Sequence, residues 1–242
     1  MRSKLSTDFS FADFRRVAPI NAENVYELVL QRQGHRVTVR RTGTAIENLK
    51  RVMGATFRIA NRSGFAAMSL RDLCKESGLS MGGLYGYIGT KDDLAAMIED
   101  VVRHASEEIP AWFESWEPGH AKLEAMLRGH IYLSEILHPW FYFVFMDSRV
   151  LPAKQKSVAK FAELHFQSKL AELALASGVH TPQTATLFAS HALALAQDWY
   201  VKRWKYVKLE VTIDAFADSV CLVLAGRQPS NALQLSTQGP QQ

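Results

Sequence analysis

The chain is poor in the features that define several large protein classes. Of its 242 residues only two are cysteines, Cys74 and Cys221, which excludes a disulfide scaffold and favours a reducing compartment. The longest run of bulky apolar residues, Trp140 to Met146, is far shorter than the roughly 20 residues of a membrane-spanning helix. Residues 1–20 carry no apolar segment typical of a secretory signal. We therefore expect a cytoplasmic protein that has no membrane partner.

Short catalytic and cofactor motifs are also missing from the sequence. There is no GxSxG, HExxH, P-loop or GxGxxG pattern, and the eight histidines show no metal-ligand spacing with cysteine or carboxylate. We expect no enzyme activity, no metal and no cofactor. What the chain does have is apolar content: 48% of it is hydrophobic, enough to bury a large core and to exclude disorder of the whole chain.

Charge is distributed unevenly along the chain. The formal net charge is only +4, yet residues 28–75 hold ten basic side chains and two acidic ones, whereas residues 101–242 hold 13 of each. One basic segment beside a neutral remainder is typical of a polyanion-binding region joined to a second functional part. Charge alone does not separate this interpretation from a solvated basic surface.

Apolar periodicity predicts helices along nearly the whole chain and no persistent strand. Residues 1–21 are expected to be poorly ordered, as is the tail from residue 228, which is rich in Ser, Asn and Gln. Ser69, Ser80 and Thr90 are the residue types that cap helix starts. The expected helices are 22–34, 44–64, 69–78, 80–88, 90–108, 118–137, 139–150, 152–177, 182–207 and 211–225.

Residues 69–88 have the pattern of a helix, a tight turn and a short helix, which is that of a helix-turn-helix. The turn at 78–80 allows two short helices to cross, and Leu73 and Leu84 are placed to pack that crossing. A plain helical hairpin would show the same turn. The basic segment around it favours DNA binding.

The second short helix is unusual in composition. Gly82 and Gly83 destabilise a helix by about 1 kcal/mol each relative to alanine, but they allow the backbone of a partner to approach closely. Tyr85 and Tyr87 offer phenol groups suited to phosphate contacts. Lys91, beside the next helix start, adds a positive charge to free backbone N–H groups, which favours an anion site.

At this point the sequence resembles the TetR family of bacterial transcriptional repressors. The resemblance is carried by the Gly-Leu-Ser turn at 78–80, the Leu-Tyr pair at 84–85, Tyr87 and the Thr-Lys-Asp-Asp-Leu run at 90–94, and it extends over residues 46–98. It implies an all-α fold with an N-terminal three-helix helix-turn-helix domain at 44–95 and a larger C-terminal helical domain for ligand binding and dimerisation at 96–227. It also implies a homodimer that reads a palindromic double-stranded DNA operator.

Small residues at Gly83 and Gly86 leave few side chains to read base edges, so readout is expected to rest on Met81, Tyr87 and backbone geometry. The residues predicted to contact DNA are Ser69, Arg71, Ser80, Met81, Gly82, Gly83, Tyr85, Tyr87, Thr90, Lys91, Arg40 and Arg41. The basic stretch 32–41 belongs to an extension, 1–43, that is expected to be partly disordered. It is either an arm that follows the minor groove or a solvated linker.

The C-terminal part is rich in aromatic residues, with nine of the chain's 25 between residues 112 and 145. Such rings build either a core or a pocket for an apolar ligand. Resemblance favours the pocket, for a small hydrophobic effector such as a fatty-acyl compound or an aromatic metabolite. The predicted ligand-binding residues are Trp112, Phe113, Trp116, His130, Trp140, Phe143, His165 and Asp198.

The last two expected helices are apolar on wide faces, and resemblance implies that they pair with a second copy as a four-helix bundle. The predicted dimer contacts are Leu187, His191, Leu195, Phe216, Val220 and Val223. The function that fits best is a sequence-specific DNA-binding regulator, most simply a repressor controlled by its ligand. The alternative is a helical apolar-ligand-binding or scaffold protein that does not bind DNA.

Overall fold

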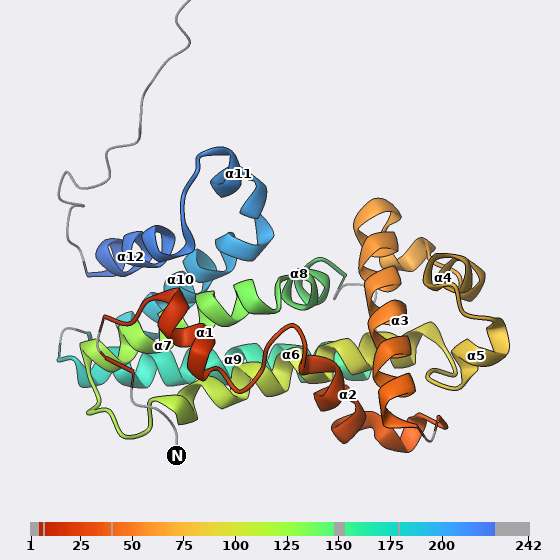
Figure 1. The fold of residues 1–242 in the computed structure, drawn as a ribbon. Helices are drawn as coiled ribbons and strands as arrows, with labels where there is room; N and C mark the ends of the chain where they lie inside the picture. The colour runs from red at the N-terminus through yellow and green to blue at the C-terminus, as the bar shows by residue number, and fades with distance from the viewer. Residues whose placement is uncertain (1–4, 7, 40, 148–152, 179, 226–242) are drawn as a thin grey trace, which may run out of the picture.

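The computed structural model describes residues 5–6, 8–39, 41–147, 153–178 and 180–225. Within these ranges all regular structure is helical and no strand occurs, which confirms the all-α expectation (Figure 1). The α-helices are α1 (Phe11–Val17), α2 (Val25–Gln33), α3 (Thr42–Ser63), α4 (Leu70–Ser77), α5 (Met81–Tyr85), α6 (Lys91–Trp112), α7 (His120–Ile136), α8 (His138–Asp147), α9 (Ala153–Ala176), α10 (Pro182–Val201), α11 (Arg203–Lys208) and α12 (Ile213–Leu224). Short 3₁₀ turns lie at Gly34–Arg36 and Phe65–Ala67.

One end of the molecule is a small head made of α3, α4 and α5 (Figure 1). Helix α3 buries a stripe that includes Leu49, Val52 and Met53, and this stripe packs against α4. Leu73 of α4 and Leu84 of α5 are fully buried, as expected for the residues that hold a helix crossing.

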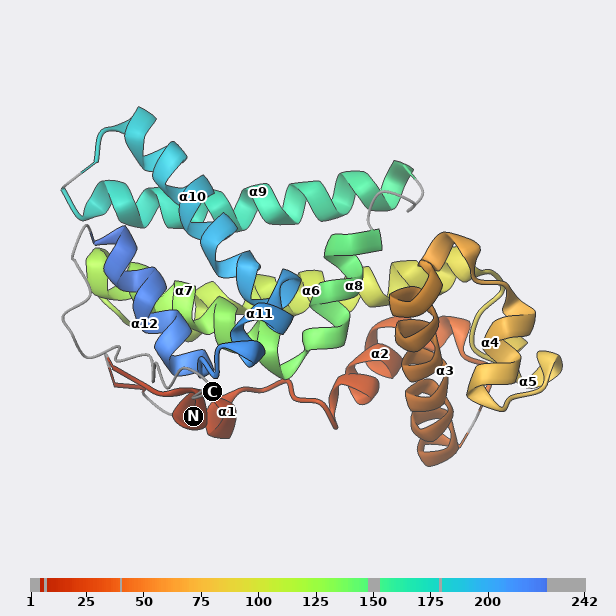
Figure 2. The ribbon, with the colours of Figure 1, turned by 90° about the horizontal axis from the view of Figure 1, so that it is seen from above.

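The rest of the molecule is a helical body that is reached through α6, which runs from the head along the body (Figure 2). Helix α7 packs against α6, α9, α10 and α12, and α9 packs along α10. Apolar residues on these helices, including Leu127, Ile131 and Leu170, are buried. The head and the body therefore share α6 as a common element, while α8 also contacts α3.

The N-terminal segment differs from the poorly ordered extension expected for residues 1–21. Helix α1 begins with a capping box between Ser10 and Asp13 and lies on the body, where Phe9 and Phe14 are buried. The ring of Phe14 lies 5.2 Å from Trp112 and 5.7 Å from Tyr132, measured between centroids. Local sequence did not reveal this order because the partners of these rings lie about a hundred residues further along the chain.

Two other helix boundaries differ from the expectation. Helix α6 continues past the expected end at 108 to Trp112 and includes Pro110 in its last turn, where the proline removes one helical hydrogen bond near the end of the helix. The expected helix 182–207 is divided at Lys202 into α10 and α11, and the ring of Tyr206 in α11 stacks on Trp199 at 5.5 Å. Within the described ranges, no helix is both long enough and apolar enough to cross a membrane.

Candidate nucleic-acid interface and ligand cavity

The turn between α4 and α5 is fixed by local hydrogen bonds and by one arginine of α3. Gly78 ends α4 in the left-handed region, at φ 70°, which glycine adopts without strain. Arg51 donates from Nε to the carbonyl of Ser77 at 2.9 Å and from its terminal nitrogen to the carbonyl of Gly78 at 2.9 Å. It thereby satisfies carbonyls that the end of α4 leaves without helical partners. Sequence reasoning counted Arg51 only as part of the basic segment.

Helix α5 has one buried side and one open side. Ser80 caps it, because its Oγ accepts the N–H of Gly83 at 3.1 Å. Leu84 faces the core, while Tyr85 is 53% exposed and Gly82 lies on the surface. A methyl group added at Gly82 would meet no atom within 4 Å. The fold itself therefore does not require glycine at this position.

Two predicted DNA contacts have structural partners instead. Tyr87 is only 1% exposed, and its hydroxyl accepts a hydrogen bond from Asn48 at 2.9 Å, so its ring is part of the core in this structure. Lys91 donates from Nζ to the carbonyls of Ala66 at 2.7 Å and Met68 at 3.4 Å. Through these hydrogen bonds Lys91 connects the start of α6 to the turn before α4.

The remaining predicted DNA contacts are helix-capping hydroxyls, exposed cations and residues of α5. The hydroxyls of Ser69 and Thr90 form capping boxes with Asp72 and Asp93. The cations Arg41 and Arg71 are exposed and form no ion pair within the part of the chain that the structure describes, and Met81 and Gly83 are half-buried in α5. Arg40 lies outside the described residues. The open groups that the structure brings together in the head are thus Ser80, Gly82 and Tyr85, with Arg41 and Arg71 on the same domain.

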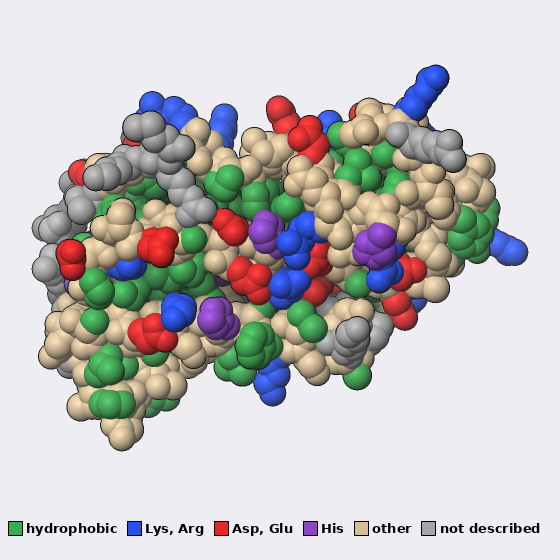
Figure 3. All heavy atoms as spheres, turned by 90° about the horizontal axis from the view of Figure 1, so that it is seen from below, with side chains coloured by type: hydrophobic (Ala, Val, Ile, Leu, Met, Phe, Trp, Pro, Cys, Tyr) green, Lys and Arg blue, Asp and Glu red, His purple; other side chains and the backbone are tan. Residues whose placement is uncertain are grey.

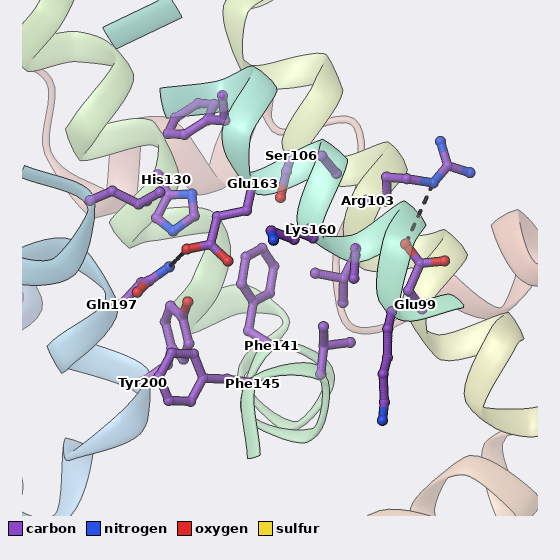
Figure 4. Close-up of a pocket in the computed structure, with 17 residues that line it drawn as sticks. Glu99, Arg103, Ser106, His130, Phe141, Phe145, Lys160, Glu163, Gln197 and Tyr200 are labelled. Carbon is purple, nitrogen blue, oxygen red and sulfur yellow. Dashed lines mark hydrogen bonds and ion pairs between the residues drawn. The ribbon is translucent and has the colours of Figure 1, made fainter. Parts of the chain in front are cut away.

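The body contains a cavity of about 580 Å³, within the roughly 300–1,000 Å³ typical of small-molecule sites. It is walled by α6, α7, α8, α9 and α10, and aromatic rings dominate its apolar side (Figure 4). The principal lining residues are Glu99, Arg103, Ser106, His130, Phe141, Phe145, Lys160, Glu163, Phe166, Gln197 and Tyr200. Every residue that lines this cavity lies within 96–227, the range predicted for the ligand-binding domain.

His130 is the polar group that lies deepest in this wall. It is 5% exposed, and neither ring nitrogen has a hydrogen-bond partner in the structure. Its ring stacks on Phe166 at 5.1 Å and meets the edge of Phe141 at 5.7 Å. Burial lowers the pKa of His130 to about 4, so the ring is neutral at pH 7 and offers one N–H donor and one nitrogen acceptor. A buried polar group without a partner is costly, which marks a place for a polar atom of a ligand.

The end of the cavity nearer the head holds a buried charge cluster. Burial raises the pKa of Glu99 to about 7, although the charge of Arg103 opposes this shift. The Nε of Arg103 lies 3.6 Å from Oε1 of Glu99 (Figure 4), and the same guanidinium binds Asp100 and donates to Glu107 at 3.1 Å. The cavity therefore holds the neutral His130, the charged pair Glu99 and Arg103, and further polar side chains, among which Gln197 donates to Glu163 at 3.4 Å (Figure 4).

Most of the predicted ligand-binding residues lie elsewhere. Of the eight, His130 lines this cavity, and Phe143 lines a second cavity of about 600 Å³ between α3, α8 and α11. Trp112 packs against Phe14 of α1, Phe113 packs against Phe9 just before α1 with ring centroids 5.7 Å apart, and Trp116 packs on Phe113. Part of the aromatic-rich stretch is therefore core, which the sequence could not show because the covering segment lies about a hundred residues away.

Three further predicted ligand residues are also accounted for. Trp140 packs between Tyr26 and Phe57, and His165 is exposed and stacks on Phe161. Burial opposes ionisation of Asp198, but hydrogen bonds from Lys205, Tyr206 and Lys202 lower its pKa to about 2 and keep it ionised. The cavity residues that sequence reasoning missed come mainly from α9 and α10, where the apolar periodicity alone does not distinguish a cavity wall from a core.

The predicted dimer contacts divide by exposure. Leu187 is 60% exposed, Leu195 36% and Val223 61%, and His191 is also on the surface. Phe216 and Val220 are each only 4% exposed, because they pack inside the single chain. Phe216 lies 5.1 Å from Trp199 between ring centroids. The exposed set is available to a second copy, and the buried pair is not.

Comparison with known proteins identifies the head. Residues 52–98 match the family model described as bacterial regulatory proteins, tetR family. No curated protein matches the chain. A crystal structure of a member of the TetR transcriptional regulator family from Streptomyces coelicolor A3 is 16% identical, covers 74% of this chain and 91% of its own, and has a TM-score of 0.57. A transcriptional regulator from Rhodococcus sp. Rha1 is 18% identical, covers 73% of this chain and 96% of its own, with a TM-score of 0.46.

Proposed function

We propose that this chain, whose residues 52–98 match the tetR family of bacterial regulatory proteins, is a ligand-controlled repressor that binds a palindromic operator as a homodimer. The family match over residues 52–98 supports a DNA-binding regulator of transcription. The observation that carries the proposal is the open side of α5, where Ser80, Gly82 and Tyr85 face solvent on a domain with a local excess of positive charge. Its place of action is the cytoplasm, where its DNA partner lies.

The DNA contact divides into base-reading and phosphate-binding groups. Tyr85 and the open backbone around Gly82 approach the major groove, since α5 is the second helix of the motif. Arg71 at the start of α4 and Arg41 before α3 bind phosphates on either side. Lys91 reaches phosphate only if it leaves the carbonyls of Ala66 and Met68, so it contributes less than its position in the sequence indicates.

Selection of duplexes from a random library, followed by fluorescence anisotropy over a salt series, tests this function. Arg71→Gln is expected to weaken binding uniformly across sequences and to reduce the salt slope by about 0.9, the value for one lost phosphate contact. Lys169→Gln is the matched control, because Lys169 lies on α9 in the body and pairs with Glu172 at 2.9 Å. Failure of the wild-type chain to select any duplex contradicts DNA binding and favours the ligand carrier without DNA binding.

The effector is expected to bind in the cavity of the body. Phe141, Phe145 and Phe166 suit an apolar or aromatic body, and His130 suits one uncharged hydroxyl or carbonyl group on it. A ligand changes operator affinity only through unequal affinity for two states of the protein, typically worth about 1–3 kcal/mol. Helix α6 lines the cavity and begins in the head, so it connects the effector site to the DNA-binding helices.

Native mass spectrometry of the purified protein, together with displacement of a neutral fluorescent probe, N-phenyl-1-naphthylamine, tests the cavity. 2-Naphthol is expected to displace the probe more strongly than naphthalene, because only 2-naphthol has a hydroxyl for His130. In His130→Phe this preference for the hydroxyl should disappear. Equal displacement by both compounds in the wild-type protein contradicts the role of His130.

A further inference from the structure

Residues 21–39, which we call the strap, precede the region matched by the family model and contact both the head and the body. The strap consists of residues 21–24, α2, the 3₁₀ turn Gly34–Arg36 and the three residues that follow it. Val25 and Val29 are fully buried where α2 packs on α3 and α6. The ring of Tyr26 lies 5.8 Å from Trp140 of α8, between centroids. The strap is therefore part of the packed structure rather than a free arm.

The C-terminal end of the strap is hydrogen-bonded to the C-terminal end of the recognition helix α5. The backbone N–H of Thr38 donates to the carbonyl of Gly86 at 2.9 Å, and Oγ1 of Thr38 lies 3.4 Å from the same oxygen. A methyl group added at Gly86 would lie 3.5 Å from Val39, which shows how closely the two segments pass. Helix α5 has only five residues, far fewer than a helix needs to be stable alone, so its orientation depends on such contacts.

The middle of the strap is anchored to α6 by a buried carboxylate. Arg32 donates from two nitrogens to the two oxygens of Asp100, each at 2.7 Å, and Gln33 adds a hydrogen bond at 3.1 Å. Burial alone would raise the pKa of Asp100, but the hydrogen bonds from Arg32 and Gln33 outweigh it and lower the pKa. Further along, Arg36 pairs with Asp93 at the start of α6. Acidic and basic side chains alternate across the middle of this face of the molecule (Figure 3).

Asp100 also connects the strap to the ligand cavity. The same carboxylate accepts a hydrogen bond from Arg103, and Arg103 and Glu99 both line the cavity (Figure 4). A continuous series of contacts thus runs from the cavity through Arg103 and Asp100 to Arg32, and along the strap to Gly86. This route leaves α6 at Asp100 and continues along the strap, whereas α6 itself enters the head at Lys91.

We propose that the strap positions the recognition helix α5, with Arg32 and Thr38 as positioning residues, and that the shared carboxylate of Asp100 makes this positioning responsive to the cavity. The inference rests on the proposed function, because it takes α5 as the DNA-reading element and the cavity as the effector site. A ligand that moves Arg103 changes the anchor of the strap, and through Thr38 it changes the angle at which α5 meets DNA.

Hydrogen exchange of residues 81–87 in the full-length, DNA-free protein tests the positioning role directly. In Arg32→Ala we expect exchange there to be about tenfold faster, because the anchor no longer protects α5 from local opening. Arg203→Ala is the matched control: Arg203 binds Glu135 through the same two-nitrogen geometry, at 2.9 and 2.6 Å, and lies on α11 away from the strap. Unchanged exchange in Arg32→Ala overturns the proposal.

Two further variants test the anchor at Asp100 and its link to the cavity. Asp100→Asn preserves side-chain volume but weakens the anchor, and it should give the same local acceleration even if Arg32→Ala folds poorly. Arg103→Gln tests the link to the cavity: exchange of 81–87 should rise about threefold although no strap residue is altered. If exchange of residues 81–87 does not rise in Arg103→Gln, the proposed link between the cavity and the strap through Asp100 is wrong. The positioning role of the strap is decided separately, by Arg32→Ala.

DNA binding gives the second measurement and separates the two hypotheses. On a duplex selected by the wild-type chain, Arg32→Ala should lose about tenfold in affinity and part of its discrimination between base sequences. Wild-type affinity and discrimination in Arg32→Ala would overturn the proposal. If the wild-type chain selects no duplex, the proposed function fails, whereas the exchange experiment still determines whether the strap holds α5.

Discussion

Gly82 is a residue at which stability and the proposed function make opposite demands. It lies inside the five-residue helix α5, where glycine disfavours helix formation, and a methyl group there would meet no atom within 4 Å. Alanine should therefore stabilise the free protein. A DNA backbone that approaches this surface closely would in contrast be blocked by the added methyl group.

We predict that Gly82→Ala raises the free energy of unfolding by up to about 1 kcal/mol while it lowers operator affinity about tenfold. Chemical denaturation and anisotropy on one protein preparation measure both effects. The unfolding curve is also the control, because a loss of affinity together with a loss of stability would indicate a damaged fold. Unchanged affinity would show that glycine is not needed for the DNA contact.

His130 should make stability depend on pH in the acidic range. Its pKa is lowered to about 4 by burial, from an unfolded value of 6.5, so below pH 6.5 the unfolded chain binds a proton that the folded chain does not. Stability therefore falls as the pH drops from 6.5 to 4, by about 3 kcal/mol from this residue.

We predict that the difference in unfolding free energy between wild type and His130→Phe changes by this amount over that pH range. Taking the difference removes groups common to both proteins, including Glu99 and Glu163 in the same cavity. A difference that is constant between pH 6.5 and pH 4 would mean that His130 is not buried as a neutral ring.

At the scale of elements, α1 acts as part of the core of the body. Phe14 is fully buried between Trp112 and Tyr132, and the backbone N–H of Phe11 donates to Asp214 at 2.7 Å, which links α1 to α12. Deleting the N-terminal extension would therefore expose core residues. A loss of DNA binding after such a deletion would not distinguish a DNA-binding arm from a destabilised body.

Phe14→Ala is expected to reduce the free energy of unfolding by about 3–5 kcal/mol, the range for a fully buried phenylalanine. Phe161→Ala is the matched control, because Phe161 is 71% exposed and its truncation should change stability by less than about 0.5 kcal/mol. Urea denaturation monitored by tryptophan fluorescence measures both variants. Similar small effects at the two positions would contradict a packed α1.

Element boundaries could be predicted where the signal was local. Ser69, Ser80 and Thr90 each accept a backbone N–H three residues later, as their residue types indicated, and Gly78 ends α4. The roles of Tyr87 and Lys91 could not be predicted, because a phenol or an ammonium group suits a phosphate and a protein partner equally well. Which of the two is present depends on Asn48, Ala66 and Met68, which lie far from them in sequence.

At the scale of the whole molecule, the predicted homodimer depends on exposed apolar residues of α10 and α12. Leu187 on α10 and Val223 on α12 are each about 60% exposed, whereas Phe216 and Val220 are used within the chain. Two heads are needed because one short helix contacts too little DNA for a specific site, and a dimer sets the spacing of the half-sites.

Leu187→Asp is expected to convert the dimer into a monomer at micromolar concentration and to abolish operator binding, because it places an unpaired charge in an apolar interface. Sedimentation velocity measures the change. Phe161→Asp, at an equally apolar and exposed position on α9, should remain dimeric. A monomeric wild-type protein at the same concentration would remove the dimer from the proposal.

The sequence by itself determined the helical content, the helix-turn-helix and its caps, since these depend on residues three or four positions apart. Tertiary structure alone decided which aromatic residues are core and which line the cavity, because α1 covers Trp112 and Phe113 while α9 and α10 leave space beside His130. It also decided that the basic segment before α3 is a packed strap. The contacts of Arg32 with Asp100 and of Thr38 with Gly86 join residues 68 and 48 positions apart, a distance that no local pattern records.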